Sequence, residues 1–239
     1  MKIPILSQLI RRIQPETLID KTARFVACEM IEGDYLEFGV YQGAAFISAY
    51  HAFREQFEDR VNLQIGGKDQ QASRARRQDL WNSMRFFAFD SFAGLPTLAD
   101  EDTSTADFEQ GQFAFPASEF RNRLKKGRVP LDRVRVVEGW FEATCTEQTR
   151  KTHDLTRAAV VWIDADLYSS ARTALEFITP LIQDGTVIIF DDWYSYRGNP
   201  KEGEQRAFQE WQETIRDRFS VQEYQKESWK RNSFIISAR

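Results

Sequence analysis

The chain has 239 residues, of which 42% are hydrophobic and 28% charged, and its formal net charge is -4 at pH 7. This length and apolar content predict one domain around a single core, and the acidic balance argues against nucleic acid as a partner. No apolar run approaches the roughly 18 residues that a membrane-spanning helix needs, so no membrane span is expected.

The N-terminal residues 1–32 are predicted to form a helical extension that packs on the body of the domain. Their apolar stretch is short, and arginines follow it instead of a small-residue cleavage site, which argues against a signal peptide. The two cysteines, Cys28 and Cys145, form no spacing pattern. A reduced, cytoplasmic protein without structural disulfides is therefore expected.

Short β-rich runs alternate with longer helical patterns, which is typical of βαβ units around a parallel sheet. Five strands are predicted at residues 35–40, 86–90, 134–137, 159–163 and 187–190. Helices are predicted at residues 44–57, 118–126, 169–182 and 202–218. Two last strands, at 221–225 and 233–237, are expected to form an antiparallel hairpin at the sheet edge. The pattern predicts a doubly wound α/β fold.

Two polar segments interrupt this alternation. Residues 58–85 are net basic and are predicted to be a mobile surface loop, and residues 97–112 are acidic and loop-like. Either loop could cover a site. Since no repeat or linker divides the chain, residues 1–239 are predicted to be a single domain.

The turn from Glu37 to Gly43, after the first strand, is the first candidate site. Gly39 and Gly43 allow a tight turn and a close approach of a ligand, and the next helix points its free N–H groups at that ligand. Doubly wound sheets bind nucleotide-like molecules at this place. The Glu37 carboxylate suits the ammonium group of a methionine moiety better than a pyrophosphate. A tight turn without a ligand is the alternative interpretation of the two glycines.

The ends of the second and third strands carry two further candidates. Asp90 can accept hydrogen bonds from ribose hydroxyls, or it can cap the turn that follows. Residues 138–141 offer an acid, a glycine and an aromatic ring that can frame an adenine, although a place in the core explains Trp140 equally well.

Four aspartates follow the fourth and fifth strands: Asp164, Asp166, Asp191 and Asp192. One helical crossover separates these strands, so a right-handed unit places them parallel and close together. Four carboxylates at one sheet edge repel one another unless a cation or protons neutralise them, and oxygen ligands suit Mg²⁺. The pattern predicts a magnesium site. Helix capping by some of the acids, such as Asp166, is the alternative.

Five runs between about residues 33 and 198 resemble the macrocin O-methyltransferase family: GDYLEFGVYQGAA, FFAFDSFAGLP, VEGWFEAT, VWIDADLYSSARTALEFITPLIQDG and VIIFDDW. The resemblance implies a class I methyltransferase sheet of seven strands with an antiparallel last strand. It also implies S-adenosylmethionine as donor, Mg²⁺ as metal, a sugar hydroxyl on a natural product as acceptor, and a homodimer or larger homo-oligomer.

The resemblance also assigns roles by position. The methionine end of the donor would lie against Glu37, Gly39 and Gly43, the ribose against Asp90 and Ser91, and the adenine against Gly139 and Trp140. The implied metal ligands are Asp164, Asp191 and Asp192, and Asp166 matches the general base. Two features depart from the family: the longer basic segment before the second strand, and Trp193 where a tyrosine is common.

Three other functions remain open at this point. A catechol or phenol acceptor also offers two adjacent oxygens to a metal. A metal-dependent glycosyltransferase could use Asp164-Ala165-Asp166 as an Asp-x-Asp motif, but Asp191 and Asp192 would then be unexplained. A binding protein that keeps the fold without the activity is the non-catalytic alternative.

Overall fold

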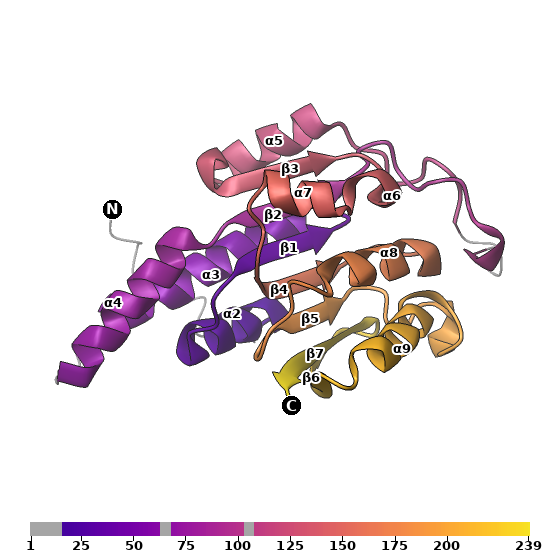
Figure 1. The fold of residues 1–239 in the computed structure, drawn as a ribbon. Coiled ribbons are helices and arrows are strands. Elements are labelled where there is room, and N and C mark those ends of the chain that lie inside the picture. Colours follow the sequence, from indigo (N-terminus) through magenta and orange to yellow (C-terminus); the bar gives the residue numbers. More distant parts are fainter. Residues whose placement is uncertain (1–15, 63–67, 103–107) are drawn as a thin grey trace.

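The computed structural model describes residues 16–62, 68–102 and 108–239. A seven-stranded sheet forms its centre, with helices on both faces (Figure 1). The strands are β1 (Asp34–Phe38), β2 (Phe86–Asp90), β3 (Val134–Glu138), β4 (Ala158–Ile163), β5 (Val187–Phe190), β6 (Phe219–Glu227) and β7 (Arg231–Ala238). Their order is β3-β2-β1-β4-β5-β7-β6, and β7 runs in the direction opposite to the other six strands. The predicted doubly wound fold, mostly parallel with an antiparallel last strand, is confirmed.

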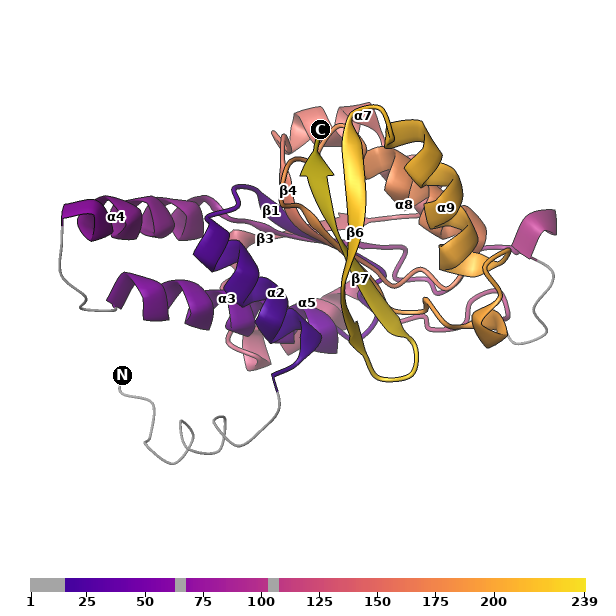
Figure 2. The same cartoon turned by 90° about the horizontal axis from the view of Figure 1, so that it is seen from below.

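The helices form two layers, one on each side of the sheet (Figure 2). One layer holds α2 (Leu18–Glu29), α3 (Ala44–Asn62), α4 (Lys68–Ser83) and α5 (Ala117–Lys126). The other holds α6 (Phe141–Thr144), α7 (Glu147–Thr152), α8 (Tyr168–Ile178) and α9 (Gly203–Ile215). Three short 3₁₀ turns accompany them: η1 (Asp100–Asp102), η2 (Leu131–Arg133) and η3 (Tyr196–Gly198).

Each helical layer has its own apolar core against the sheet. Because successive strand residues point to opposite faces, Tyr35 of β1 packs with the α2–α5 layer, whereas Leu36 and Phe38 pack with the α8–α9 layer. All residues of β4 and β5 are buried. Strands covered on both faces read as nearly continuous apolar runs, which is why these two were recognisable in the sequence.

The interpretation of residues 58–85 as a mobile surface loop is wrong for most of their length. Helix α3 continues to Asn62, and α4 occupies 68–83, while residues 63–67 lie outside the described residues. The α4 sequence is rich in Gln, Ala and Arg, which are good helix formers, and only its last turns enter the core, through Leu80 and Trp81. Because apolar residues do not recur at helical spacing along most of α4, the hydrophobic pattern did not predict this helix.

The position of α4 also excludes it as a cover for a site at the carboxyl ends of the strands. Helix α4 leads into the amino end of β2 and projects away from those carboxyl ends (Figure 1). The described part of residues 97–112 is loop with the short turn η1, and residues 103–107 lie outside it.

Helix α2 falls within the expected N-terminal extension, and it buries Val26 and Ala27 in the core; residues 1–15 are outside the described part of the chain. None of the helices in the described ranges is both long and apolar enough to cross a membrane.

Candidate active site

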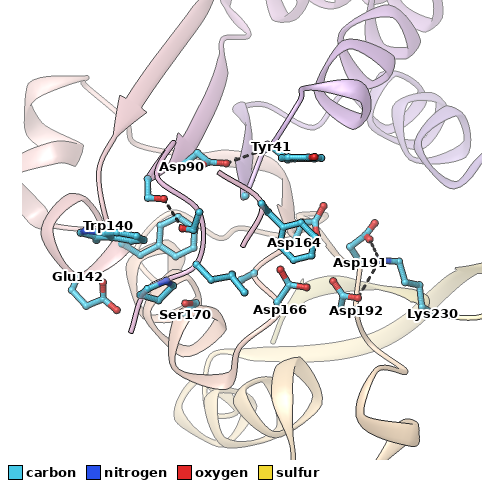
Figure 3. A pocket seen from close by; sticks show the side chains of 18 residues that line it. Tyr41, Asp90, Trp140, Glu142, Asp164, Asp166, Ser170, Asp191, Asp192 and Lys230 are labelled. Carbon is cyan, nitrogen blue, oxygen red and sulfur yellow. Dashed lines mark hydrogen bonds and ion pairs between the residues drawn. The ribbon is translucent and has the colours of Figure 1, made fainter. Parts of the chain in front are cut away.

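A cavity of about 230 Å³ lies at the carboxyl ends of the central strands (Figure 3). Eight of the residues that the sequence singled out line it: Gly39, Asp90, Ser91, Trp140, Asp164, Asp166, Asp191 and Asp192. Three others do not line it: Glu37, Gly43 and Gly139. The cavity has two parts, an aromatic half beside β1–β3 and an acidic half at the ends of β4 and β5.

The aromatic half is formed by Tyr41, Phe113 and Trp140. These rings are 44%, 43% and 38% exposed, and the Tyr41 and Phe113 ring centroids lie 5.9 Å apart in an edge-on arrangement. Trp140 is therefore not a core residue, so that alternative is wrong. Aromatic side chains left open on a cavity wall provide flat apolar surface for a ring-shaped ligand.

Asp90 fastens two turns together at the boundary of the cavity. Its Oδ2 accepts hydrogen bonds from the backbone N–H groups of Val40 at 2.8 Å and Tyr41 at 2.9 Å, and its Oδ1 accepts one from Phe92 at 2.7 Å. The role as a turn residue is thus present in the structure. A carboxylate has about four acceptor positions, so Asp90 can still accept a hydroxyl from a ligand.

Gly39 and Gly43 are required for different reasons. Gly39 has φ 86°, and a Cβ there would lie 1.9 Å from the carbonyl oxygen of Asp164. The absence of a Cβ at Gly39 therefore lets the turn after β1 lie directly against Asp164 of the acidic half. Gly43 also has a left-handed φ, of 80°, but a Cβ there would meet the buried ring of Phe120 at 2.7 Å. Packing against α5, and not an approach to the cavity, accounts for Gly43.

Glu37 is fully buried and does not line the cavity. It lies on the same face of β1 as Tyr35, and its Oε2 accepts a hydrogen bond of 2.5 Å from the Tyr35 hydroxyl. Burial, with the nearby charges of Asp191 and Asp90, raises the pKa of Glu37 to about 8. Glu37 does not line the cavity, so the predicted contact of its carboxylate with an ammonium group stays a prediction.

The acidic half brings together Asp164, Asp191 and Asp192. One oxygen of each carboxylate lies within 4.8 Å of the others, which confirms that β4 and β5 deliver their terminal acids to one place. The register explains this: Ile163 pairs with Phe190, so Asp164 and Asp191 leave the two strands side by side. Burial, followed by repulsion from Asp191 and Asp192, raises the pKa of Asp164 well above its ordinary value.

The chemistry of this cluster fits a hard divalent cation. Three carboxylates offer only oxygen ligands, which Mg²⁺ prefers. The Oδ2 atom of Asp192 is buried and has no hydrogen-bond partner among the described residues. A buried acceptor left without a partner costs about 1–3 kcal/mol, and a cation coordinated there would remove that cost.

Two basic residues that the sequence analysis did not identify close the acidic half. Lys230 Nζ lies 2.6 Å from Asp191 Oδ2 and 3.1 Å from Asp192 Oδ1, and Arg231 Nε lies 2.5 Å from Asp191 Oδ1. Burial lowers the pKa of Lys230, but the two aspartates outweigh it and hold that pKa above its ordinary value. The available signal was the antiparallel last strand, because its first residues must lie beside the end of the strand that it pairs with.

Glu204, in the first turn of α9, was also missed. Its Oε2 accepts a 2.9 Å hydrogen bond from the Asp192 backbone N–H, and its Oε1 accepts a 3.4 Å bond from that of Ala165. Burial, and then the charge of Asp192, raises its pKa well above the ordinary value. One side chain thus holds the turn after β4 and the turn after β5. From the sequence alone, Glu204 is an acid at the start of a helix, where a negative charge interacts favourably with the helix dipole.

Asp166 lies beside the three-acid cluster, on the floor of the cavity (Figure 3). Its backbone has a left-handed φ of 56°, and its carbonyl accepts a 2.6 Å hydrogen bond from the Tyr196 hydroxyl of η3. Burial, and then the neighbouring Asp192, raises the pKa of Asp166 to about 7. A carboxylate with a pKa in this range can exchange protons with a ligand at neutral pH.

Comparison with known proteins gives a consistent relationship. The model of a family described as Macrocin-O-methyltransferase (TylF) matches residues 75–220, which is more than half of the chain. A Streptomyces olivaceus 8-demethyl-8-(2,3-dimethoxy-alpha-L-rhamnosyl)-tetracenomycin-C 4'-O-methyltransferase is 27% identical over 70% of this chain and 56% of its own length. Mycinamicin III 3''-O-methyltransferase of Micromonospora griseorubida is 27% identical over 68% of this chain and 56% of its own length.

The chain therefore spans little more than half the length of these curated relatives. Among solved structures, the calicheamicin methyltransferase CalS11 covers 96% of this chain with 79% of its own, at 21% identity and a TM-score of 0.63. This likeness shows that the two chains share a fold.

Proposed function

This chain belongs to the macrocin O-methyltransferase (TylF) family, and we propose that it transfers the methyl group of S-adenosylmethionine to a sugar hydroxyl on a natural product. The observation that carries the proposal is the convergence of Asp164, Asp191 and Asp192 on the wall of the same cavity as the aromatic rings. The names of both curated relatives, which are O-methyltransferases of a rhamnosyl-tetracenomycin and of mycinamicin III, support the acceptor class.

The donor would lie across the aromatic half of the cavity. We propose that Trp140 stacks on the adenine, that Asp90 accepts the ribose hydroxyls, and that Gly39 and Ser91 line the path between them. Gly43 and Gly139 would act by shaping the turns beside the donor. The ammonium group of the methionine moiety would lie over Glu37.

The acceptor would enter the acidic half. Asp164, Asp191 and Asp192 would hold Mg²⁺, which when bound supplies a Lewis acid that lowers the pKa of an acceptor hydroxyl. Asp166 would receive the hydroxyl proton, because its carboxyl group shares the cavity with the cluster. The acceptor oxygen forms its bond to the methyl carbon as the carbon–sulfur bond breaks, which leaves S-adenosylhomocysteine. Alignment of the two ligands would dominate the rate enhancement.

Two variants test this assignment. Asp166→Asn should lower methyl transfer by at least about a hundredfold, the lower end of what general acid–base catalysis contributes. Asp191→Ala, which removes a ligand of the proposed metal, should also lower it strongly. Product formation is measured by mass spectrometry over a panel of glycosylated acceptors, catechols and phenols, with Mg²⁺ or EDTA. Asp217→Asn, an exposed acid beyond the end of α9, is the matched control and should keep full activity. Undiminished turnover in both test variants would contradict the mechanism.

The other readings have their own tests. Calorimetry with S-adenosylmethionine and with a series of sugar nucleotides separates a methyltransferase from a glycosyltransferase. Tight donor binding without turnover on any acceptor would favour a binding protein. The homodimer or larger homo-oligomer that the family resemblance implies stays a prediction, which light scattering can test, and the cytoplasmic location also stays a prediction.

A further inference from the structure

The β6–β7 hairpin inserts a positive charge between two of the three clustered aspartates. The Nζ atom of Lys230 bridges the carboxylates, at 2.6 Å from Asp191 Oδ2 and 3.1 Å from Asp192 Oδ1 (Figure 3). The strand register enforces this position, because Phe190 at the end of β5 pairs with Asn232 near the start of β7. Lys230 therefore belongs to the acidic half of the cavity by topology as well as by charge.

The ammonium group satisfies the cluster incompletely. Asp191 has a cation on each oxygen, Lys230 on Oδ2 and Arg231 on Oδ1. Asp192 uses Oδ1 for Lys230 and for a 2.9 Å hydrogen bond from the Ser195 hydroxyl, whereas its buried Oδ2 has no partner among the described residues. Two positive charges thus face the carboxylates of Asp164, Asp166, Asp191 and Asp192.

Lys230 and a divalent cation would compete for the same carboxylates. A cation held by Asp164, Asp191 and Asp192 would share Asp191 and Asp192 with the ammonium group that already pairs with both. Two positive charges a few ångströms apart in a buried site repel strongly. Arg231 differs, because its guanidinium also pairs with Glu227 at 2.9 Å and so has a second anchor within the hairpin.

We propose that Lys230 is a resident counter-ion that exchanges with the divalent metal at this cluster. In the absence of metal its ammonium group neutralises Asp191 and Asp192; when the metal binds, Lys230 leaves the cluster and turns toward solvent. Its side chain is already 29% exposed, so it has a path outward. The proposal rests on the metal site of the proposed function, and it makes the hairpin a determinant of metal affinity.

The first experiment measures metal affinity by calorimetry with Mg²⁺ and with Mn²⁺ alone, without donor or acceptor. Lys230→Met should bind both ions at least about tenfold more tightly than the wild type, the lower end of coupling for a close charge pair. Lys230→Gln, which keeps a polar side chain, should show the same direction and serves if the methionine variant folds poorly. Lys226→Met is the matched control, since Lys226 lies in the same hairpin and pairs with Glu223 instead.

The second experiment separates exchange from simple repulsion, and it uses the wild-type protein. An amine-acylating reagent is added with EDTA or with saturating Mg²⁺, and modification of each lysine is followed by peptide mass spectrometry. Mg²⁺ should raise the modification rate of Lys230 several-fold and leave that of Lys226 unchanged.

Either of two results would overturn the exchange: unchanged or weaker metal binding in both Lys230 variants, or a Lys230 modification rate that Mg²⁺ does not raise. If the wild type methylates acceptors but neither it nor the variants bind either ion, the metal part of the proposed function fails, and the exchange fails with it. If metal exchange is observed without any methyl transfer, the exchange stands and the proposed activity fails.

Discussion

The two halves of the cavity solve different problems. The aromatic half is open to solvent and is organised by backbone hydrogen bonds to Asp90, so its rings need only be held at the right angle. In the acidic half, Asp191 and Asp192 are buried and Asp164 and Asp166 are half-buried. Lys230 and Arg231 offset these like charges, and Glu204 holds the two turns that carry them. A flat apolar wall can stay exposed to solvent, whereas clustered carboxylates need opposite charges or hydrogen bonds to offset their repulsion.

The largest expected effect is the change in folding stability with pH that the buried carboxyl group of Glu37 causes. The pKa of Glu37 is about 8 in the folded chain, against an ordinary value of 4.5, so the folded state binds the extra proton between these values. This contribution to stability is fully present below about pH 4.5 and is lost as the pH rises through 8. At about 1.36 kcal/mol per pKa unit, the loss reaches at most about 5 kcal/mol.

The variant Glu37→Gln removes this proton and should lose this part of the pH dependence. Urea unfolding in EDTA, at intervals from pH 4.5 to 8.5, should show the stability of the wild type falling relative to the variant. Glu58→Gln, which changes an exposed acid on α3, is the control and should differ from the wild type by a constant amount. Parallel curves for the wild type and Glu37→Gln would refute a neutral Glu37.

The next largest effect is a steric clash at Gly39, where the turn after β1 lies against the turn after β4. Gly39→Ala should lower the free energy of unfolding by about 3 kcal/mol, because its Cβ would collide with the Asp164 carbonyl and its φ is left-handed. Gly111→Ala is a matched control: it has φ 80° and open space around the added Cβ, so only the strain of about 1 kcal/mol applies. Equal losses in the two variants, measured by urea unfolding, would show that the Asp164 contact is unimportant.

The smallest effect on stability belongs to the aromatic half. Trp140→Ala should change the free energy of unfolding by less than about 1 kcal/mol, since the ring is 38% exposed. It should weaken S-adenosylmethionine binding about tenfold in calorimetry, the worth of one aromatic stacking contact. Trp229→Ala, which removes a ring 74% exposed and outside the cavity, should leave donor affinity unchanged. Equal donor affinities in the two variants would remove Trp140 from the proposed donor site.

The sequence predicted the buried strands and the residues that follow from their order in a parallel sheet. Buried strands such as β4 are apolar runs, and their carboxyl ends share one edge of a parallel sheet, so the meeting of Asp164 with Asp191 followed from topology. Helix α4 was missed because its polar sequence has no apolar stripe for most of its length.

The parts of the site that escaped prediction depend on contacts between distant segments. Lys230 reaches Asp191 through the pairing of β7 with β5, and Glu204 reaches Asp192 and Ala165 through the packing of α9. Nothing in the local sequence distinguishes these residues from other charged residues on a hairpin or a helix. Glu37 is the opposite case. Its place in the turn motif predicted a side chain at the ligand, but the structure buries that side chain in the core.

The single carboxylate of Glu204 has a consequence for the order of assembly. Because it fastens the turns after both acidic strands, the spacing of the aspartates is fixed when α9 docks, without waiting for an ion. The contacts that hold the two turns together thus oppose the repulsion between the aspartates in the folded chain. The ligands of the proposed cation site would therefore already be in position before any ion binds.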